Sequence, residues 1–238
     1  GKEERLAFFR NEEINPDYLN MDPKKVTEEA LKIRNKIKAE SDMEENPIDM
    51  DLEPVPPFKV SDDIRLIIIG QDPTVKNQLR RKYIKKTLNL DKSGGSLRNY
   101  TEKVICKGLD IDLNNVYATN IFKYFYETPP ARTPDVMYKH LDMNLMLLRN
   151  EINAYPDVPV ISLGEPVLQM LSKDNYDKVR KYWDYQQGLS GNNFRKCTDN
   201  DLDRPFYPFP HQPSSVRKFY SETIKQYLNF VKKDSWNK

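Results

Sequence analysis

The stretch Ile64-Arg65-Leu66-Ile67-Ile68-Ile69, closed by Gly70, decides the fold class. Its residues are aliphatic on both alternating faces, which is typical of a strand buried on both sides within a parallel sheet. Residues 115–121 and 158–163 form two similar runs, and Gly164 closes the second. Helical patterns separate the runs. The sequence therefore predicts an α/β fold, a three-layer α/β/α sandwich around a central, mostly parallel sheet.

Helical spacing of apolar residues predicts four helices around these strands. The first begins with Asp22 as N-cap and Pro23 at the first helical position, and fades near Glu40. The second begins at Thr133-Pro134 and continues to residue 152 as one helix, the third covers residues 165–171, and the last covers about 215–232.

Residues 41–57 are acidic and rich in proline, so we interpret them as an irregular connector that is not a domain boundary. We expect residues 1–55 to form a helical extension packed on an α/β domain of residues 56–238. The sequence assigns no function to that extension, which could be a cap on the domain or a partner-binding segment.

Composition excludes several classes of site. The 238 residues include 38 Lys and Arg against 36 Asp and Glu, so the net charge of +2 does not by itself demand a nucleic-acid partner. Two cysteines cannot supply a four-cysteine metal centre, and two histidines exclude a site of several imidazoles. No apolar run is long enough to span a bilayer. We therefore expect a cytoplasmic monomer with free thiols, no metal and no cofactor.

Ligands of open α/β sheets bind beyond the carboxyl ends of the strands, so the residues that follow each strand are the candidate site. In this chain they are residues 70–74, then Thr119 and Asn120, then Gly164 and Glu165, and residues 210–214 near the C-terminus.

Five motifs in this order resemble the uracil-DNA glycosylase superfamily. Gly70-Gln71-Asp72-Pro73 is similar to the water-activating motif, and residues 94–100 resemble the serine loop. Residues 116–120 resemble the strand that ends in the uracil-reading Asn, and residues 160–164 resemble the strand before a backbone-contact loop. Residues 211–214 resemble the terminal His-Pro-Ser motif, with Gln212 inserted or substituted. Each motif alone is weak, but their order and their positions after strands strengthen the resemblance.

The resemblance implies roles for individual residues. Asp72 would stabilise the sugar cation and orient water, and His211 would stabilise the negative charge on the departing base. Asn120 would pair with uracil, because an amide both donates and accepts hydrogen bonds. Gly70, Gln71 and Leu88 would shape the base pocket. Blander interpretations stay open: Asp72 as a turn residue, His211 as a capping or core residue, and Asn120 as a loop amide.

Contacts to DNA phosphates would come from short loops, by the same resemblance. The matching positions are Ser96, Gly164, Glu165, Ser214 and Ser215, with Val216 as a duplex wedge beside Arg217. Residues 76–92 add a basic run, which is either a solvated face or a track for the DNA backbone (Lys76, Arg80, Arg81, Lys82, Lys85, Lys86 and Lys92). His140, in a charged helical stretch, is expected at the surface.

Several positions depart from the family pattern. Thr74 replaces a Tyr that excludes thymine, Val75 replaces a His, and Leu88, with Tyr83 as a rival, replaces a base-stacking Phe. The sequence therefore predicts a glycosylase that flips uracil or a related damaged base out of single- or double-stranded DNA and hydrolyses its N-glycosidic bond. The alternative is a catalytically weakened protein of the same fold that binds DNA or another protein.

Overall fold

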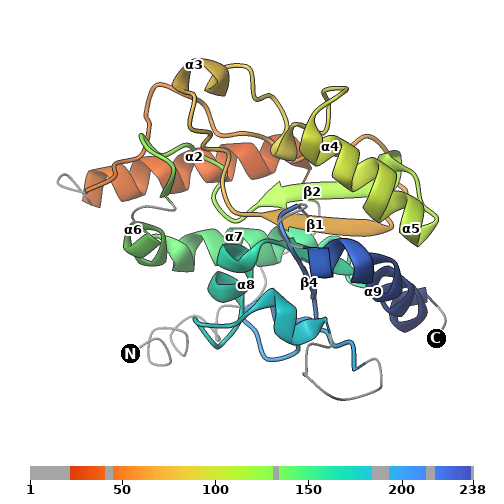
Figure 1. Ribbon diagram of the computed structural model, residues 1–238. Coiled ribbons are helices and arrows are strands. Elements are labelled where there is room, and N and C mark those ends of the chain that lie inside the picture. Colours follow the sequence, from red (N-terminus) through yellow and green to blue (C-terminus); the bar gives the residue numbers. More distant parts are fainter. Residues whose placement is uncertain (1–21, 41–44, 131–133, 184–192, 213–217, 237–238) are drawn as a thin grey trace.

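A computed structural model describes residues 22–40, 45–130, 134–183, 193–212 and 218–236. Within these ranges one sheet has four parallel strands in the order β2-β1-β3-β4. Figure 1 labels β1, β2 and β4. The strands are β1 (Leu66–Gly70), β2 (Val116–Asn120), β3 (Val160–Leu163) and β4 (Tyr207–Phe209), and every residue in them is buried. The predicted α/β fold with a parallel sheet is confirmed.

β4 is the strand that sequence reasoning missed. It has only three residues, Tyr-Pro-Phe, and Pro208 lacks an N–H group for the ladder. Proline is tolerated here because β4 lies at the edge of the sheet and pairs with β3 alone. A strand this short carries no readable alternation in its sequence.

Helices cover both faces of the sheet. Between β1 and β2 come α3 (Gln78–Arg81), α4 (Ser96–Tyr100), a π-helical segment (Thr101–Cys106) and α5 (Lys107–Leu109). Between β2 and β3 come α6 (Pro134–Lys139) and α7 (Leu141–Asn153), and α8 (Glu165–Leu171) follows β3. Since β2 and β3 flank β1 on opposite sides, right-handed crossovers place α5 and α7 on opposite faces. α9 (Lys218–Trp236) packs against α5, which completes three layers.

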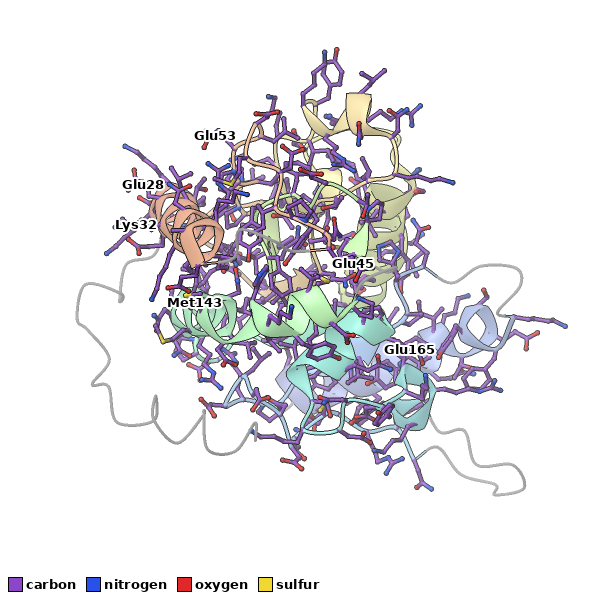
Figure 2. All side chains as sticks on the ribbon, turned by 90° about the vertical axis from the view of Figure 1, so that its left-hand side faces the viewer. Glu28, Lys32, Glu45, Glu53, Met143 and Glu165 are labelled. Carbon is purple, nitrogen blue, oxygen red and sulfur yellow. The ribbon has the colours of Figure 1, made fainter. Side chains whose placement is uncertain are left out.

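The strand order locates the ligand crevice. The chain leaves β1 for β2 on one side and later returns to β3 on the other, so the topological switch point lies between β1 and β3. Open α/β sheets bind ligands there, outside the carboxyl ends of the strands. β2 points to the left in Figure 1, and Figure 2 views the molecule from that side, onto the carboxyl ends of the strands. Glu165, at the start of α8, is labelled there.

Residues 22–40 and 45–58 pack on the α/β body. α2 (Pro23–Glu40) begins at the predicted position, because Asp22 Oδ1 accepts the Lys25 N–H at 2.8 Å. Val26 and Ala30 of α2 pack against Leu147 of α7. Figure 2 shows the outward side chains of α2, Glu28 and Lys32, at the side of the molecule.

The connector after α2 runs antiparallel to β2 and to the chain that follows it. The N–H groups of Asp49 and Val55 donate to the carbonyls of Phe125 and Lys123 at 2.8 and 2.7 Å, and Phe58 bridges to Ala118. The 41–57 connector is thus bound to the sheet edge over its described residues, 45–57.

Two expectations about residues 133–152 were wrong. The single helix is two helices that meet at His140, where the backbone leaves the helical region (φ −93°, ψ 1°). His140 is buried, with 4% exposure, because its ring stacks on Tyr126 and its Nδ1 lies 3.3 Å from the Tyr126 hydroxyl. The expected start at Thr133, and residues 215–217 of the last helix, lie outside the described residues.

Three further features concern the chemistry of the chain. Cys106 and Cys197 are free thiols, and both are buried. In the described part of the chain, no group of three or more His, Cys, Asp or Glu side chains is placed to hold a metal ion. No helix in those ranges has the length and apolar character that crossing a bilayer requires.

Candidate active site

The ends of β1 and β2 are held in register. Gly70 pairs with Asn120, and the pairing continues past the strands, because the N–H groups of Ile121 and Phe122 donate to the carbonyls of Gly70 and Gln71, both at 2.9 Å. The Gln71 side chain points toward α6, with Nε2 3.0 Å from the Met137 sulfur. The first strand-end motif and Asn120 are therefore fixed relative to each other.

Gly70, Leu88 and Asn120 form one group. A Cβ atom on Gly70 would overlap Asn120 Oδ1 and lie 2.9 Å from Leu88 Cδ2, so only glycine fits beside these two side chains. Asn120 is 1% exposed, and its Oδ1 has no hydrogen-bond partner among the described residues. Buried polar atoms almost always have partners, so an unpaired one at a strand end suits a ligand that donates a hydrogen bond.

Leu88 is held in a strained backbone conformation. Its φ is 58° and its ψ 13°, and Asn89 follows with φ 52°. A bulky residue in this left-handed region is an outlier that costs roughly 1–2 kcal/mol. Such strain gathers at ligand sites, and here it places the aliphatic side chain against Gly70.

Asp72 is held by the residue two positions further on. Its Oδ1 accepts the Thr74 N–H at 2.8 Å, and Thr74 Oγ1 in turn accepts the Tyr126 N–H at 2.9 Å. Burial raises the pKa of Asp72 from 3.8 to about 6, although the bonds from Thr74 and the charge of Arg81 oppose the rise. The carboxyl group is thus largely ionised at neutral pH, yet poorly hydrated.

Arg81 anchors the loop that carries Asp72. Its guanidinium donates to the carbonyls of Val75, Tyr126 and Glu127 at 3.0, 2.8 and 3.0 Å. The side chain is 2% exposed, so the prediction that Arg81 belongs to a surface-exposed basic run is wrong. The charged side chain can be buried because its N–H donors bind three backbone carbonyls.

The other cations of the run remain available at the surface. Lys76, Arg80, Lys82 and Lys85 are exposed, while Lys86 and Lys92 are half-buried. Two apolar side chains stand among them: Leu79 is 76% exposed and Tyr83 is 58% exposed. We call this the α3 surface, defined by residues 76–86. It directly follows the Asp72 loop in sequence.

His211 and Gly164 form a second group at the same edge. A Cβ on Gly164, whose φ is 95°, would lie 3.5 Å from His211 Cβ. His211 is exposed to solvent on one side, but atoms around the other side displace water and lower its pKa, so the ring is neutral at pH 7. Gly164 lies two strands from Asn120, which corresponds to roughly 10 Å. The two groups lie on either side of the switch point.

Of the remaining expected DNA contacts, the structure describes Ser96 and Glu165. Ser96 is exposed and lines, with Tyr100, Gln212 and Ile224, a cavity of 530 Å³ between α4 and α9. The Tyr100 hydroxyl donates to the Pro210 carbonyl at 3.3 Å, which ties α4 to the His211 loop. Glu165 opens α8 and is half-buried. Four expected contacts lie outside the described residues (Ser214, Ser215, Val216 and Arg217).

The family model of the uracil DNA glycosylase superfamily matches residues 57–232, well over half of the chain. The chain belongs to this superfamily. Its members are typically DNA glycosylases, and membership implies binding to DNA. No curated protein matches the chain in sequence.

Sequence reasoning missed three positions of this glycosylase-superfamily site. For Thr74 the sequence predicts only the space that its small side chain leaves, whereas Thr74 binds both Asp72 and the Tyr126 N–H. For Arg81 the sequence predicts a surface cation, whereas its side chain is buried. Lys123 went unnoticed, although a lysine inside the apolar run Ile121-Phe122-Lys123-Tyr124-Phe125 signals a buried charge that needs a partner.

Proposed function

We propose that the protein is a DNA glycosylase that hydrolyses the N-glycosidic bond of uracil, or of a related damaged base, after flipping the nucleotide out of the helix. One observation carries this proposal. The buried, unpaired Oδ1 of Asn120 lies against Gly70 and Leu88 at the strand edge that also bears Asp72. Uracil offers an N3–H donor to such an oxygen, whereas cytosine has an acceptor at N3 and would leave it unpaired.

Asp72 would stabilise the cation that develops on the sugar and orient the attacking water. Its pKa of about 6 supports this role, because at neutral pH the group carries a charge that little water screens. The Thr74 N–H donates to one carboxylate oxygen, which would orient the carboxylate toward the sugar.

His211 would stabilise the negative charge that develops on O2 of the departing base. A neutral imidazole can donate one N–H to that oxygen, and the lowered pKa of His211 keeps the ring neutral at pH 7. A preorganised donor of this kind lowers a barrier by about 3–4 kcal/mol.

Two residues would widen the substrate range. Leu88 offers an aliphatic surface to the flipped base, so part of a stacking energy of about 1–3 kcal/mol would be lost. Thr74 is smaller than the Tyr that the family's water-activating motif carries at this position, and the Thr74 hydroxyl accepts the Tyr126 N–H. Space at C5 of the base would then admit uracils that carry a substituent there.

The α3 surface would track the DNA backbone next to the flipped nucleotide. Four exposed cations lie there, and residues 73–90 contain no acidic residue to oppose them. Phosphate contacts of this kind bind DNA without reading its sequence, and they weaken as salt rises.

The test is base release from oligonucleotides that contain a single uracil, 5-substituted uracil or thymine, in single- and double-stranded form. Alkaline cleavage at the resulting abasic site reports the product. We expect release of uracil by the protein, a loss of at least a hundredfold in Asp72→Asn, and no loss in Asp91→Asn, which alters an exposed carboxylate. Binding of uracil-containing DNA without release of any base would instead favour the binding-module alternative.

A further inference from the structure

The described residues contain a buried ion pair beneath the end of β2. Lys123 and Glu151 are both 0% exposed, and Lys123 Nζ lies 2.7 Å from Glu151 Oε2. Lys123 follows β2 by three residues, and Glu151 belongs to α7. Neither side chain has a role in the proposed chemistry, which leaves the pair unexplained.

The pair is linked to Asn120 through the backbone. Lys123 Nζ donates to the Asn120 carbonyl at 2.7 Å, whereas the Thr119 hydroxyl approaches the same oxygen only at 3.5 Å. Glu151 Oε1 accepts the Tyr117 hydroxyl at 2.7 Å. Burial and the charge of Glu151 raise the pKa of Tyr117, so that hydroxyl stays protonated and donates. One network therefore joins α7 to both ends of the segment 117–120.

We propose that Lys123 and Glu151 are positioning residues that fix the peptide of Asn120, so that its side-chain amide faces the base. This inference rests on the proposed glycosylase function. The orientation of the Asn120 carbonyl sets the direction of its Cα–Cβ bond, and the amide must fit between Gly70 and Leu88, where the space is fully used. A displacement of about 1 Å at a reacting or reading group can cost about a hundredfold in rate.

Stability alone does not account for the pair. Two charges lose their hydration on burial, and well-packed apolar or neutral replacements of such pairs are often as stable as the original. The pair instead orients the Asn120 peptide, because Glu151 holds the Lys123 ammonium group where it donates to the Asn120 carbonyl.

The chain contains a matched control for this network. Lys196 Nζ lies 2.6 Å from Asp234 Oδ2, which also accepts the Tyr207 hydroxyl at 2.5 Å. The same three kinds of group, a lysine, a carboxylate and a tyrosine, thus meet near the C-terminal end of α9. Tyr207 begins β4, so this network lies at the amino end of the strands, away from Asn120.

The experiment compares Lys123→Met/Glu151→Gln with Lys196→Met/Asp234→Asn in full-length protein. On duplex DNA with a single uracil, we expect the first variant to lose at least tenfold in kcat while KM and affinity for abasic duplex change by less than twofold. The control should keep kcat within twofold. A second variant, Glu151→Gln alone, retains the tyrosine bond and should lose kcat in the same direction, so a folding failure of the double variant leaves the inference testable.

A second readout separates this inference from the proposed function. The ¹H–¹⁵N resonances of the Asn120 side-chain amide should shift in the Lys123→Met/Glu151→Gln variant and stay unchanged in the control, whether or not any base is released. Unchanged resonances together with unchanged kcat would overturn the positioning role. An inactive parent protein with shifted resonances would instead refute the glycosylase proposal and leave the positioning role standing.

Discussion

Replacing Asp72 by asparagine should stabilise the folded protein at neutral pH while it removes the proposed activity. Burial raises the pKa of Asp72 from 3.8 to about 6. Each pKa unit corresponds to about 1.4 kcal/mol, so the folded state loses about 3 kcal/mol by carrying this charge above pH 6. Asparagine keeps an oxygen that can accept the Thr74 N–H, and it carries no charge. We therefore expect a gain of about 2–3 kcal/mol, or roughly 5–10 °C in Tm.

The gain should depend on pH in a defined way. The folded state binds the Asp72 proton more tightly than the unfolded state, so the stability of the parent protein falls as pH rises from about 4 to 6. The variant lacks this loss. The difference between the two should vanish below pH 3.8, grow up to about pH 6 and stay constant above it.

Urea unfolding of both proteins at several pH values, followed by circular dichroism, measures this difference. Other titrating groups cancel in the comparison, because they are common to both proteins. Asp91→Asn, at an exposed position, provides the baseline and should show no such step. A difference that is independent of pH, or an Asp72→Asn protein that is less stable at pH 7.5, would refute the argument that burial of this carboxylate costs stability.

Three other predictions concern the same edge of the sheet. Gly70→Ala should abolish base release in a cleavage assay, because the added methyl group would displace the Asn120 amide. The control Gly108→Ala places a methyl group 2.5 Å from Leu228 Cδ1, where α5 packs on α9, and should destabilise the protein without abolishing release. Equal activities of the two variants would contradict this prediction. Arg81→Met should destabilise the folded protein by about 3 kcal/mol or more, since three carbonyls lose their donor. It should also raise the pKa of Asp72, so that the acid limb of the pH profile of kcat/KM moves to higher pH. An acid limb that stays in place would argue against an effect of the Arg81 charge on Asp72. Replacing Lys76, Arg80 and Lys82 by serine should weaken DNA binding equally for all sequences and reduce the magnitude of the slope of log K against log salt by about 2–3. An unchanged slope would show that the α3 surface does not contact DNA.

Much of the fold could be predicted because its signals are local. The strand around residues 66–70, the start of α2 at Pro23 and the bounds of α8 all follow from apolar runs and capping residues. β4 could not be predicted, since three residues with a central proline carry no periodicity. The break at His140 could not be predicted either, because it depends on the stacking of its ring against Tyr126, which is distant in sequence.

Part of the candidate site could likewise be predicted from sequence, and part could not. Strand ends indicated Gly70, Asp72, Asn120 and Gly164, because position after a buried strand can be read from sequence. The role of Arg81 could not be predicted, since its polar and basic neighbours in sequence do not distinguish a buried cation from a solvated one, whereas the apolar neighbours of Lys123 signal its burial but not its partner. Only the fold shows that three backbone carbonyls surround the first and a carboxylate the second.

The segment 46–58 has a consequence for how this protein can be dissected. It pairs with β2 through Phe58 and with the chain that follows β2 through Asp49 and Val55, and these backbone groups would otherwise be open to pairing with another chain. The region matched by the family model begins at residue 57, so a fragment cut at that boundary would keep Phe58 but lose Asp49 and Val55, which leaves the carbonyls of Lys123 and Phe125 open to another chain. Such a fragment should self-associate by edge-to-edge pairing, and studies of the isolated α/β domain need residues 46–56 kept in place.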